Sequence, residues 1–393
     1  IISRGCDVAD LGVVATPTAM LVVEKMQALG GVVISASHNP SEWNALKLVS
    51  HEGSFLDFET MTTFLSSISE DSQGDVSSWD TLGTYHLDEG ASDRHIEKIL
   101  GLSVVDPERL RERGFKVALD CVRGAGGVIM PRLLEALGCE VVAIHTEVDG
   151  MFPRDPEPTA QNLKELSHLV RSTGAEIGFA VDPDVDRLAL VDEYGKPVGE
   201  DLTLALATDV ALRQESGTVV TNLSTSQVLE DVVRHHGGEL IRTAVGEINV
   251  VRGMQKQSAV IGGEGNGGVI LPELHYTRDA PLAAALILQN LLEMASSLSE
   301  SVAKWPRYTI QKKKVDFPRA NLPRAYSVLK SEMFGAQLDE TDGLRMSWPE
   351  ENKWVHVRPS GTEPVIRLIA EACNRGAVEA LLEEVANHLE EVR

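Results

Sequence analysis

Three aspartates at alternate positions give the strongest chemical signal in the sequence, in the segment DPDVDR at residues 182–187. Carboxylates spaced in this way within a short loop can converge on one hard cation. An EF-hand calcium loop is the rival interpretation, because Glu193 stands at its twelfth position, but Arg187 occupies the place where that loop needs glycine. Three carboxylates followed by an arginine suit Mg²⁺ and a phosphate oxygen. We therefore predict a metal site formed by Asp182, Asp184 and Asp186.

A serine between small and polar residues is the candidate nucleophile. The segment SASHNP (residues 35–40) follows a β-branched run, which predicts a buried parallel strand whose carboxyl end carries this loop, where open α/β folds bind ligands. Ser37 could accept a phosphoryl or acyl group there, and the absence of a GxSxG elbow disfavours an esterase. Lys47 lies close enough in sequence to bind phosphate or to act as an acid or base. The alternatives are a simple Asn-Pro turn and a surface lysine.

Two further loops hold the residue types that bind sugars and phosphates. Five glycines in GGEGNGG (residues 262–268) imply a close approach of the backbone to another group, and the only side chains that can bind there are Glu264 and Asn266. In RPSGTEP (residues 358–364) an arginine and two hydroxyls surround a glycine, which is typical of an anion-binding loop. A flexible turn and a hairpin turn are the alternatives. The predicted phosphate-binding residues are Arg358, Ser360, Gly361, Thr362 and Arg367.

Other polar residues give weaker signals. Glu247 and Asn249, in the segment GEIN, are candidates to face the same cleft. The histidines His145, His235, His236 and His275 have no metal-ligand spacing, so we interpret them as structural.

Alternating strands and helices must position these loops. We expect strands over residues 32–35, 116–120, 140–144, 177–181, 188–191 and 218–222, and helices over residues 18–29, 163–173 and 227–236. This alternation predicts parallel α/β layers with crossover helices. The C-terminal part differs, because a hairpin between Trp348 and Trp354, strands over 355–357 and 365–370, and a helix over 377–392 predict a small α+β domain. Linkers are expected near residues 91–94, 195–201 and 305–306.

The composition is that of a globular protein. Of its 393 residues, 43% are hydrophobic and 24% are charged, which argues against disorder. With 36 Lys and Arg against 59 Asp and Glu, the net charge is −23, and this disfavours nucleic acid or an anionic membrane as a partner. No apolar run reaches the ~20 residues of a membrane span. The four scattered cysteines fit free thiols in a reducing compartment, so we expect a cytoplasmic protein.

Taken together, the four loops resemble those of the α-D-phosphohexomutase superfamily. They occur in the order and spacing of that family, and TPT (residues 16–18) and FPRDPEP (residues 152–158) match as well. The resemblance spans the chain and implies a four-domain α/β molecule around a central cleft. Two early segments of the family, GT[SD]GIRG and GRDxR, are absent from this sequence, so the first of three related α/β domains is expected to be truncated. The expected domains are residues 1–90, 91–197 and 198–304, with a smaller α+β domain at 305–393.

The resemblance also implies a mechanism, which is reversible phosphoryl transfer through phosphorylated Ser37 and a bisphosphorylated sugar. Mg²⁺ would be held by the three aspartates and an oxygen on Ser37, and hexose 1,6-bisphosphate would be the activator and intermediate. Arg187, Lys47 and His38 would assist the transfer. The glycine-rich loop would bind sugar hydroxyls, and the fourth loop with Arg367 would bind the phosphate that does not react.

The expected reaction is conversion of glucosamine 6-phosphate to glucosamine 1-phosphate. The sequence resembles archaeal-type phosphoglucosamine mutases at residues 42–47, 263–268 and 276–280. A phosphomannomutase or phosphoglucomutase is the alternative, and a metal-dependent sugar phosphatase or a non-catalytic sugar-phosphate-binding protein are the other hypotheses. The expected partner is a phosphosugar, with neither nucleic acid nor membrane, and the protein is expected to be a monomer or homodimer.

Overall fold

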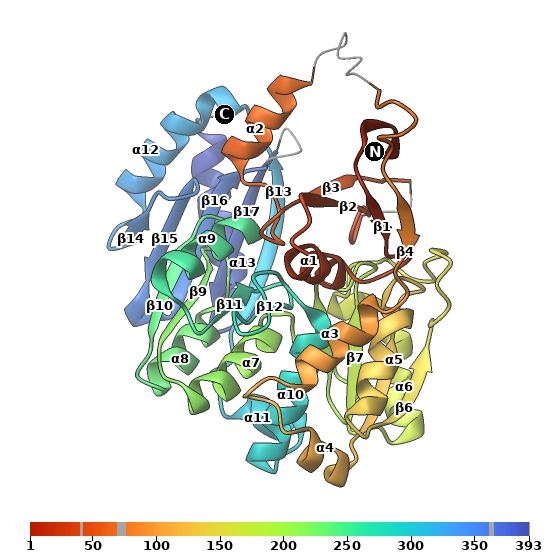
Figure 1. Ribbon diagram of the computed structural model, residues 1–393. Coiled ribbons are helices and arrows are strands. Elements are labelled where there is room, and N and C mark those ends of the chain that lie inside the picture. The colour runs from red at the N-terminus through yellow and green to blue at the C-terminus, as the bar shows by residue number, and fades with distance from the viewer. Residues whose placement is uncertain (40–41, 69–75, 361–364, 393) are drawn as a thin grey trace.

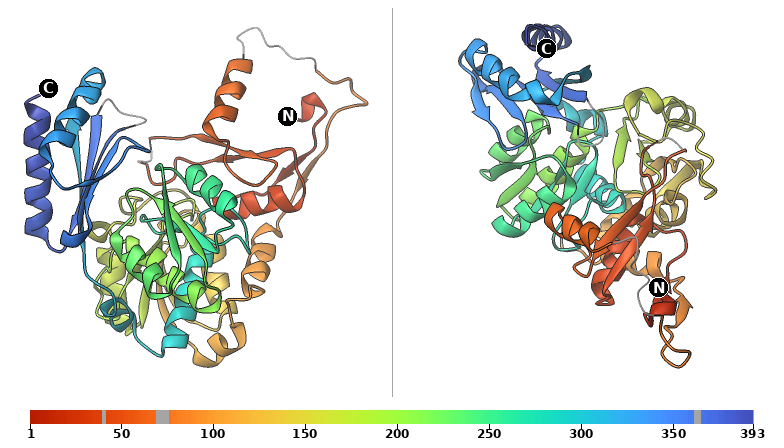
Figure 2. Two further views of the ribbon diagram at one scale, coloured as in Figure 1. Left: turned by 90° about the vertical axis from the view of Figure 1, so that its left-hand side faces the viewer. Right: turned by 90° about the horizontal axis from the view of Figure 1, so that it is seen from above.

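The structure, a computed structural model, describes residues 1–39, 42–68, 76–360 and 365–392. Within these residues, two four-stranded sheets form the middle of the molecule, and a five-stranded sheet forms its C-terminal part (Figure 1). Two small two-stranded sheets belong to the N-terminal part. The N-terminal and C-terminal parts stand at opposite sides above the middle of the molecule (Figure 2).

The first central sheet carries the predicted metal loop. Its strands are ordered β6-β5-β7-β8, with β8 antiparallel to β7 and the other pairs parallel. The predicted strands over 116–120, 140–144, 177–181 and 188–191 are confirmed, and a strand over 188–191 excludes an EF-hand loop. The elements are α3 (Ala91–Leu100), α4 (Pro107–Arg113), β5 (Lys116–Asp120), α5 (Gly126–Ala136), β6 (Glu140–Ile144), α6 (Lys164–Thr173), β7 (Ile177–Val181) and β8 (Leu188–Val191). Residues 91–94, predicted as a linker, instead form the first turn of α3, where Ala91 and Ser92 are buried.

The second central sheet repeats this arrangement and carries the glycine-rich loop. Its order is β10-β9-β11-β12, again with an antiparallel last strand. The predicted strand over 218–222 is confirmed. The elements are α7 (Asp201–Gln214), β9 (Thr218–Asn222), α8 (Gln227–His235), β10 (Glu239–Thr243), α9 (Glu247–Gln257), β11 (Ile261–Glu264), β12 (Gly268–Ile270), α10 (Ala280–Met294) and α11 (Leu298–Ala303).

The N-terminal part differs from the expected repeat. The predicted buried parallel strand over 32–35 is β2 (Gly30–Ile34), which pairs in antiparallel register with β3 (Leu46–Ser50) in a two-stranded sheet. Val32 is 51% and Ile34 69% exposed, because a sheet of two strands brings too few neighbours to cover this face. The prediction of a buried parallel strand was therefore wrong. The other elements are β1 (Val8–Asp10), α1 (Thr16–Lys25), α2 (Phe58–Ser67) and β4 (Tyr85–Leu87).

The C-terminal part is the predicted α+β unit. Its antiparallel sheet has the order β13-β17-β16-β15-β14, and the predicted hairpin between Trp348 and Trp354 joins β15 to β16. Apolar residues of α12 and α13 pack with those of the sheet in one cluster. The elements are β13 (Thr309–Asp316), α12 (Leu322–Glu332), β14 (Gln337–Asp339), β15 (Leu344–Trp348), β16 (Lys353–Pro359), β17 (Val365–Ala372) and α13 (Arg375–Glu390).

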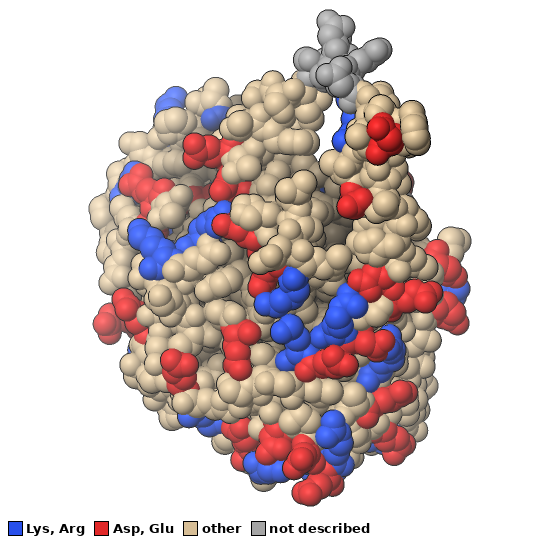
Figure 3. All heavy atoms as spheres, in the orientation of Figure 1, with Lys and Arg blue, Asp and Glu red and all other residues tan. Residues whose placement is uncertain are grey.

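One hydrophobic cluster runs through both central units. It includes residues of β5, β7, α5, α7 and α10, and α10 is apolar on every face and buried along most of its length, as expected for a helix surrounded by protein. This shared core fixes the two central sheets, and the loops at their strand ends, relative to each other. No helix of the described residues is long and apolar enough to cross a membrane. The four cysteines are free, and acidic and basic side chains are interspersed on the face seen in Figure 3.

Candidate active site

The three predicted metal ligands lie together in the turn from β7 to β8. Their side chains are buried, and their nearest carboxylate oxygens all lie within 4.8 Å of one another. Asp182 closes the turn, because its Oδ1 accepts the backbone N–H groups of Asp186 at 3.1 Å and Arg187 at 3.2 Å. Val185 adopts a left-handed φ of 66°, which reverses the chain so that the alternate carboxylates converge.

The side chains around these carboxylates do not provide hydrogen bonds for all of their oxygens. Lys47 Nζ lies 2.5 Å and Thr16 Oγ1 lies 2.8 Å from Asp184 Oδ2, whereas Asp184 Oδ1 and Asp186 Oδ1 are buried with no hydrogen-bond partner among the described residues. Burial, and then repulsion by the neighbouring aspartates, raises the pKa of Asp182 well above its usual value. Burial alone would also raise the pKa of Asp184, but Lys47 outweighs it and lowers that pKa to about 2. An all-oxygen donor set with unpartnered buried oxygens fits Mg²⁺.

The structure brings Ser37 to this cluster from a distant part of the sequence. Ser37 Oγ donates a hydrogen bond to Asp182 Oδ2 at 3.1 Å and lies 3.3 Å from His38 Nδ1. Its backbone has a φ of 52°, an uncommon conformation for a residue with a side chain and one that is enriched at functional sites. The turn is fixed by a hydrogen bond from Ser37 N to Ser35 Oγ at 2.9 Å. Ser37 is thus held beside the acidic cluster.

The remaining predicted catalytic residues lie around Ser37 and the three aspartates. Arg187 contacts Glu157 at 3.3 Å and Asp186 at 3.7 Å, so the segment FPRDPEP supplies one of its partners. Burial, followed by the charge of Arg187, lowers the pKa of His38 to about 4, and the ring is therefore neutral at pH 7. Burial would lower the pKa of Lys47, but Asp184 and Asp186 outweigh it and raise that pKa. Lys47 therefore stays charged.

Glu264 is the last residue of β11, and Asn266 lies in the turn that follows it. Glu264 Oε1 accepts hydrogen bonds from Asn222 Nδ2 at 2.8 Å and from the Gly246 backbone at 3.3 Å. Asn266 Nδ2 lies 3.4 Å from Glu264 Oε2. The glycines are required by close packing: Gly267 has a φ of 90°, and a Cβ on it would lie 2.5 Å from the carbonyl oxygen of Leu188 in the metal-loop strand. This turn therefore packs directly on β8.

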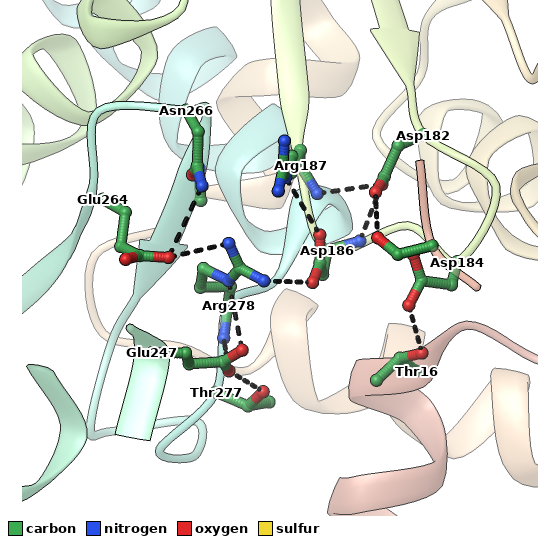
Figure 4. Close-up of polar contacts among 12 residues, drawn as sticks. Thr16, Asp182, Asp184, Asp186, Arg187, Glu247, Glu264, Asn266, Thr277 and Arg278 are labelled. Carbon is green, nitrogen blue, oxygen red and sulfur yellow. Dashed lines mark hydrogen bonds and ion pairs between the residues drawn. The ribbon is translucent and has the colours of Figure 1, made fainter. Parts of the chain in front are cut away.

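Arg278 is a buried residue of this site that the sequence did not reveal as a site residue. Its guanidinium lies 2.5 Å from Asp186 Oδ2, 2.8 Å from Glu264 Oε2 and 3.1 Å from Glu247 Oε2 (Figure 4). Glu247, a weak candidate from the sequence, is thus a buried partner of Arg278. In the sequence, residues 276–280 indicated only a resemblance to archaeal-type phosphoglucosamine mutases. The available signal was that this arginine directly precedes Asp279, which caps the apolar helix α10.

The predicted phosphate-binding residues that the structure describes lie at or next to neighbouring ends of two inner strands of the C-terminal sheet. Arg358 on β16 is directly opposite Arg367 on β17, which is opposite Lys314 on β13. A row of three cations gives this part of the sheet a positive potential, which attracts anions. Ser360 is buried, and Gly361 and Thr362 lie outside the described residues. Sequence reasoning missed Lys314, although the run KKK at residues 312–314 was available as a signal.

A chain of contacts connects this loop to the glycine-rich loop. Asp342 Oδ2 lies 2.9 Å from Arg358 Nε and accepts the backbone N–H of Val245 at 3.0 Å. Val245 precedes Gly246, whose N–H contacts Glu264. His356 Nδ1, on β16, also lies 2.9 Å from Ser224 Oγ, next to β9. Strand β16, which leads to the predicted phosphate-binding loop, is therefore joined to the second central unit.

Family models match all four parts of the chain. They are described as phosphoglucomutase/phosphomannomutase domains, namely α/β/α domain I at residues 1–74, domain II at 93–195, domain III at 199–308 and the C-terminal domain at 329–388. The chain belongs to the phosphoglucomutase/phosphomannomutase family, within the α-D-phosphohexomutase superfamily. The expected four-domain architecture, its α/β class and the enzymatic, isomerase nature of the protein are thereby confirmed.

Individual relatives agree with this assignment. A Methanopyrus kandleri protein named "Probable phosphoglucosamine mutase" is 37% identical over all of this chain and 86% of its own length. A Thermococcus kodakarensis "Phosphoglucomutase/phosphomannomutase" is 35% identical over all of this chain and 85% of its own length. A crystal structure of a phosphoglucomutase/phosphomannomutase family protein from Burkholderia thailandensis, 25% identical, superposes with a TM-score of 0.83 over 100% of this chain and 84% of that one.

Proposed function

We propose that this family member is a phosphoglucosamine mutase, which interconverts glucosamine 6-phosphate and glucosamine 1-phosphate as a cytoplasmic monomer or homodimer. The observation that carries the proposal is the position of Ser37 Oγ, 3.1 Å from Asp182 Oδ2 at the edge of a buried acidic cluster. A serine in this position can carry a phosphoryl group next to a bound cation. The names of the relatives favour glucosamine as the sugar, and phosphomannomutase or phosphoglucomutase activity is the alternative.

The proposed reaction has two half-reactions that mirror each other. In the first, a hydroxyl oxygen of the sugar phosphate forms a bond to phosphorus while the bond from phosphorus to Ser37 Oγ breaks. In the second, the other phosphate of the bisphosphorylated sugar is transferred to Ser37 Oγ, so that the serine is phosphorylated again. Phosphoryl transfer of this kind depends mainly on positioning and charge stabilisation.

The residues around Ser37 fit these tasks. His38 is neutral at pH 7 because burial and Arg187 lower its pKa to about 4, and a ring nitrogen can accept the hydroxyl proton. Lys47 stays charged and, with Arg187, can stabilise negative charge on the phosphoryl oxygens. Mg²⁺, when bound by Asp182, Asp184, Asp186 and an oxygen on Ser37, would neutralise charge on the transferring group.

The substrate side of the proposal uses the other two loops. Glu264 and Asn266 would bind sugar hydroxyls. Arg358, Ser360 and Arg367 would hold the phosphate that does not react. The row of cations formed by Arg358, Arg367 and Lys314 favours binding of an anion near these strand ends. A phosphatase would need no means of retaining a bisphosphorylated sugar, so this second phosphate site favours a mutase.

The test is a comparison of initial rates on three substrates by phosphorus NMR, with Mg²⁺ and a catalytic amount of hexose 1,6-bisphosphate. We expect kcat/KM for glucosamine 6-phosphate to exceed the values for mannose 1-phosphate and glucose 1-phosphate by at least ~10-fold, which is about 1.4 kcal/mol in transition-state binding. Ser37→Ala is the inactive control. Equal or faster reaction of mannose or glucose phosphates would support the alternative, release of free phosphate would indicate a phosphatase, and an unreacted sugar would contradict both.

A further inference from the structure

Arg278 connects the two loops proposed to bind metal and sugar. Its Nη2 contacts Asp186 Oδ2 at 2.5 Å, and its Nη1 contacts Glu264 Oε2 at 2.8 Å (Figure 4). These carboxylates belong to different central sheets. Among the ion pairs of the described part of the chain, this is the one that bridges both loops.

The guanidinium is held in this orientation by a third carboxylate. Glu247 Oε2 accepts from Arg278 Nε at 3.1 Å, while Glu247 Oε1 accepts the Arg278 backbone N–H at 2.9 Å. Thr277 Oγ1 donates to the same Oε1 at 2.5 Å. Glu247 contacts neither Asp186 nor the glycine-rich loop in these hydrogen bonds, so it acts as a brace on Arg278 and the adjacent Thr277.

The glycine-rich loop is shaped to admit this side chain. A Cβ on Gly268 would lie 2.3 Å from Arg278 Cδ, a distance too short for two carbon atoms that are not bonded. The absence of a side chain at residue 268 therefore lets Arg278 pack against the glycine-rich loop and reach Glu264. This packing is independent of the ion pairs and places Arg278 in the same interface.

The charge of Arg278 is shared between its partners. Burial would lower the pKa of the guanidinium, but Asp186, Glu247 and Glu264 outweigh it and raise that pKa well above its usual value. Asp186 uses Oδ2 for the arginine, while its buried Oδ1 has no hydrogen-bond partner among the described residues. Asp186 thus lies between two arginines, with Oδ2 at Arg278 and Oδ1 3.7 Å from Arg187 Nε, and belongs to the group of three aspartates that could hold a cation.

We propose that Arg278 is a positioning residue that couples occupancy of the metal site to the glycine-rich loop. A cation that draws on Asp186 weakens its pairing with Arg278, and the guanidinium then pairs more closely with Glu264 and fixes it for sugar hydroxyls. Because such coupling is reciprocal, a substitution that removes the pairing of Arg278 with Glu264 also changes the affinity for the cation. This inference rests on the proposed function and extends it, since it assigns a residue that makes metal and sugar binding interdependent.

The test is a double-mutant cycle on Mn²⁺ binding, measured without sugar on the full chain by the loss of the free-ion EPR signal. Glu264→Gln leaves Arg278 to pair more fully with Asp186 and to compete with the cation, so we expect the Kd for Mn²⁺ to rise about 5-fold. Arg278→Lys keeps the charge but cannot span both loops. In that background we expect Glu264→Gln to change the Kd by less than about 2-fold.

Two outcomes would overturn the proposal. The same factor in both backgrounds would mean that Glu264 acts on the cation only through its field, because Arg278→Lys preserves the charge. No effect of Glu264→Gln in the wild-type background would mean that the loops are not coupled. Glu273→Gln, at a carboxylate that binds Ser103 outside the site, is the matched control and should leave the Kd unchanged.

A second variant covers the case in which Arg278→Lys does not fold. Glu247→Gln loosens the brace without changing either loop, and it should likewise reduce the effect of Glu264→Gln. Circular dichroism and thermal unfolding report whether each variant is folded. The cycle does not depend on turnover. Absence of isomerisation in the wild type would reject the mutase. If the wild type is active but Glu264→Gln changes the Kd for Mn²⁺ by the same factor in both backgrounds, only the coupling is rejected.

Discussion

Two buried clusters of potential metal ligands lie in the part of the molecule that the structure describes, and they differ in charge. The first is the group of three aspartates in the turn from β7 to β8. The second places Asp279 Oδ2 2.8 Å from His95 Nε2 and 2.8 Å from His275 Nε2. In the second cluster one carboxylate has two imidazole partners, and Thr18 Oγ1 lies 2.8 Å from His95 Nδ1.

The comparison shows that ligand type alone does not identify a cation site. In the aspartate cluster the pKa of Asp182 is raised by burial and by its neighbours, so a cation would relieve the repulsion. Burial would raise the pKa of Asp279 too, but His95 and His275 outweigh it and lower that pKa below its usual value. Asp279 also caps α10 through the backbone N–H of Leu282. The second cluster is therefore balanced internally and joins α1, α3 and α10.

The largest expected effect separates the two clusters by activity. Asp184→Asn should reduce kcat/KM for the proposed isomerisation by about 10³-fold, because the charge stabilisation from a bound metal amounts to several kcal/mol. His95→Asn, in the balanced cluster, should leave kcat/KM within about 3-fold at a temperature where the variant is folded. Initial rates by phosphorus NMR measure both values. Equal losses in the two variants would contradict the distinction.

The second effect separates them by metal-linked stability. A cation that binds only the folded state adds about 2.7 kcal/mol to the free energy of unfolding at a hundredfold excess over Kd. We expect denaturant unfolding of the wild type to show this gain with Mg²⁺, and Asp182→Asn to lose it. His275→Asn should keep the gain despite its lower basal stability. If only His275→Asn lost the Mg²⁺-dependent gain in the free energy of unfolding, the cation would bind in the cluster of His95, His275 and Asp279 instead.

The sequence was most informative where a feature depends on neighbouring residues. The strands over 116–120, 177–181 and 188–191 could be predicted to the residue, because short, mainly apolar runs there end at or directly before an aspartate. The convergence of the three aspartates could be predicted for the same reason, since a spacing of two within one turn is a local property. Their roles in catalysis stay predictions.

Features that depend on how the sheets pack could not be predicted. Ser37 meets Asp182 and Lys47 meets Asp184 across more than a hundred residues, and nothing in either segment encodes the other. Arg278 was missed because its three partners come from three separate segments of the sequence. The exposure of β2 was also missed, since an apolar run does not reveal how many strands will surround it. His275 showed no metal-ligand spacing because His95, in the same cluster, lies far away in the sequence.

The smallest effect concerns pH and compares Asp279 with a third aspartate, Asp201, the first residue of α7. Asp201 Oδ1 accepts the backbone N–H of Ser226 at 2.9 Å, but burial, and then repulsion by Glu371, raises its pKa to about 7. Between pH 3.8 and about 7 this side chain is ionised when unfolded and protonated when folded. It therefore binds more protons in the folded state, and its contribution to stability falls as pH rises through that range.

Asp279 has the opposite sign, because its pKa is lowered on folding. Its contribution is complete above its unfolded value of 3.8 and is lost as the pH falls below that value. Asp201→Asn, which keeps the Oδ1 acceptor for Ser226, should therefore gain of the order of 2 kcal/mol over wild type at pH 8, a figure discounted for partial solvent screening, and little at pH 4. Asp279→Asn should lose stability at pH 8 and approach wild type as the solution is acidified. Urea unfolding at both pH values measures these differences, and parallel pH profiles for the two variants would contradict the assignment, because a carboxylate stabilised by imidazoles and one destabilised by burial must respond to protons in opposite directions.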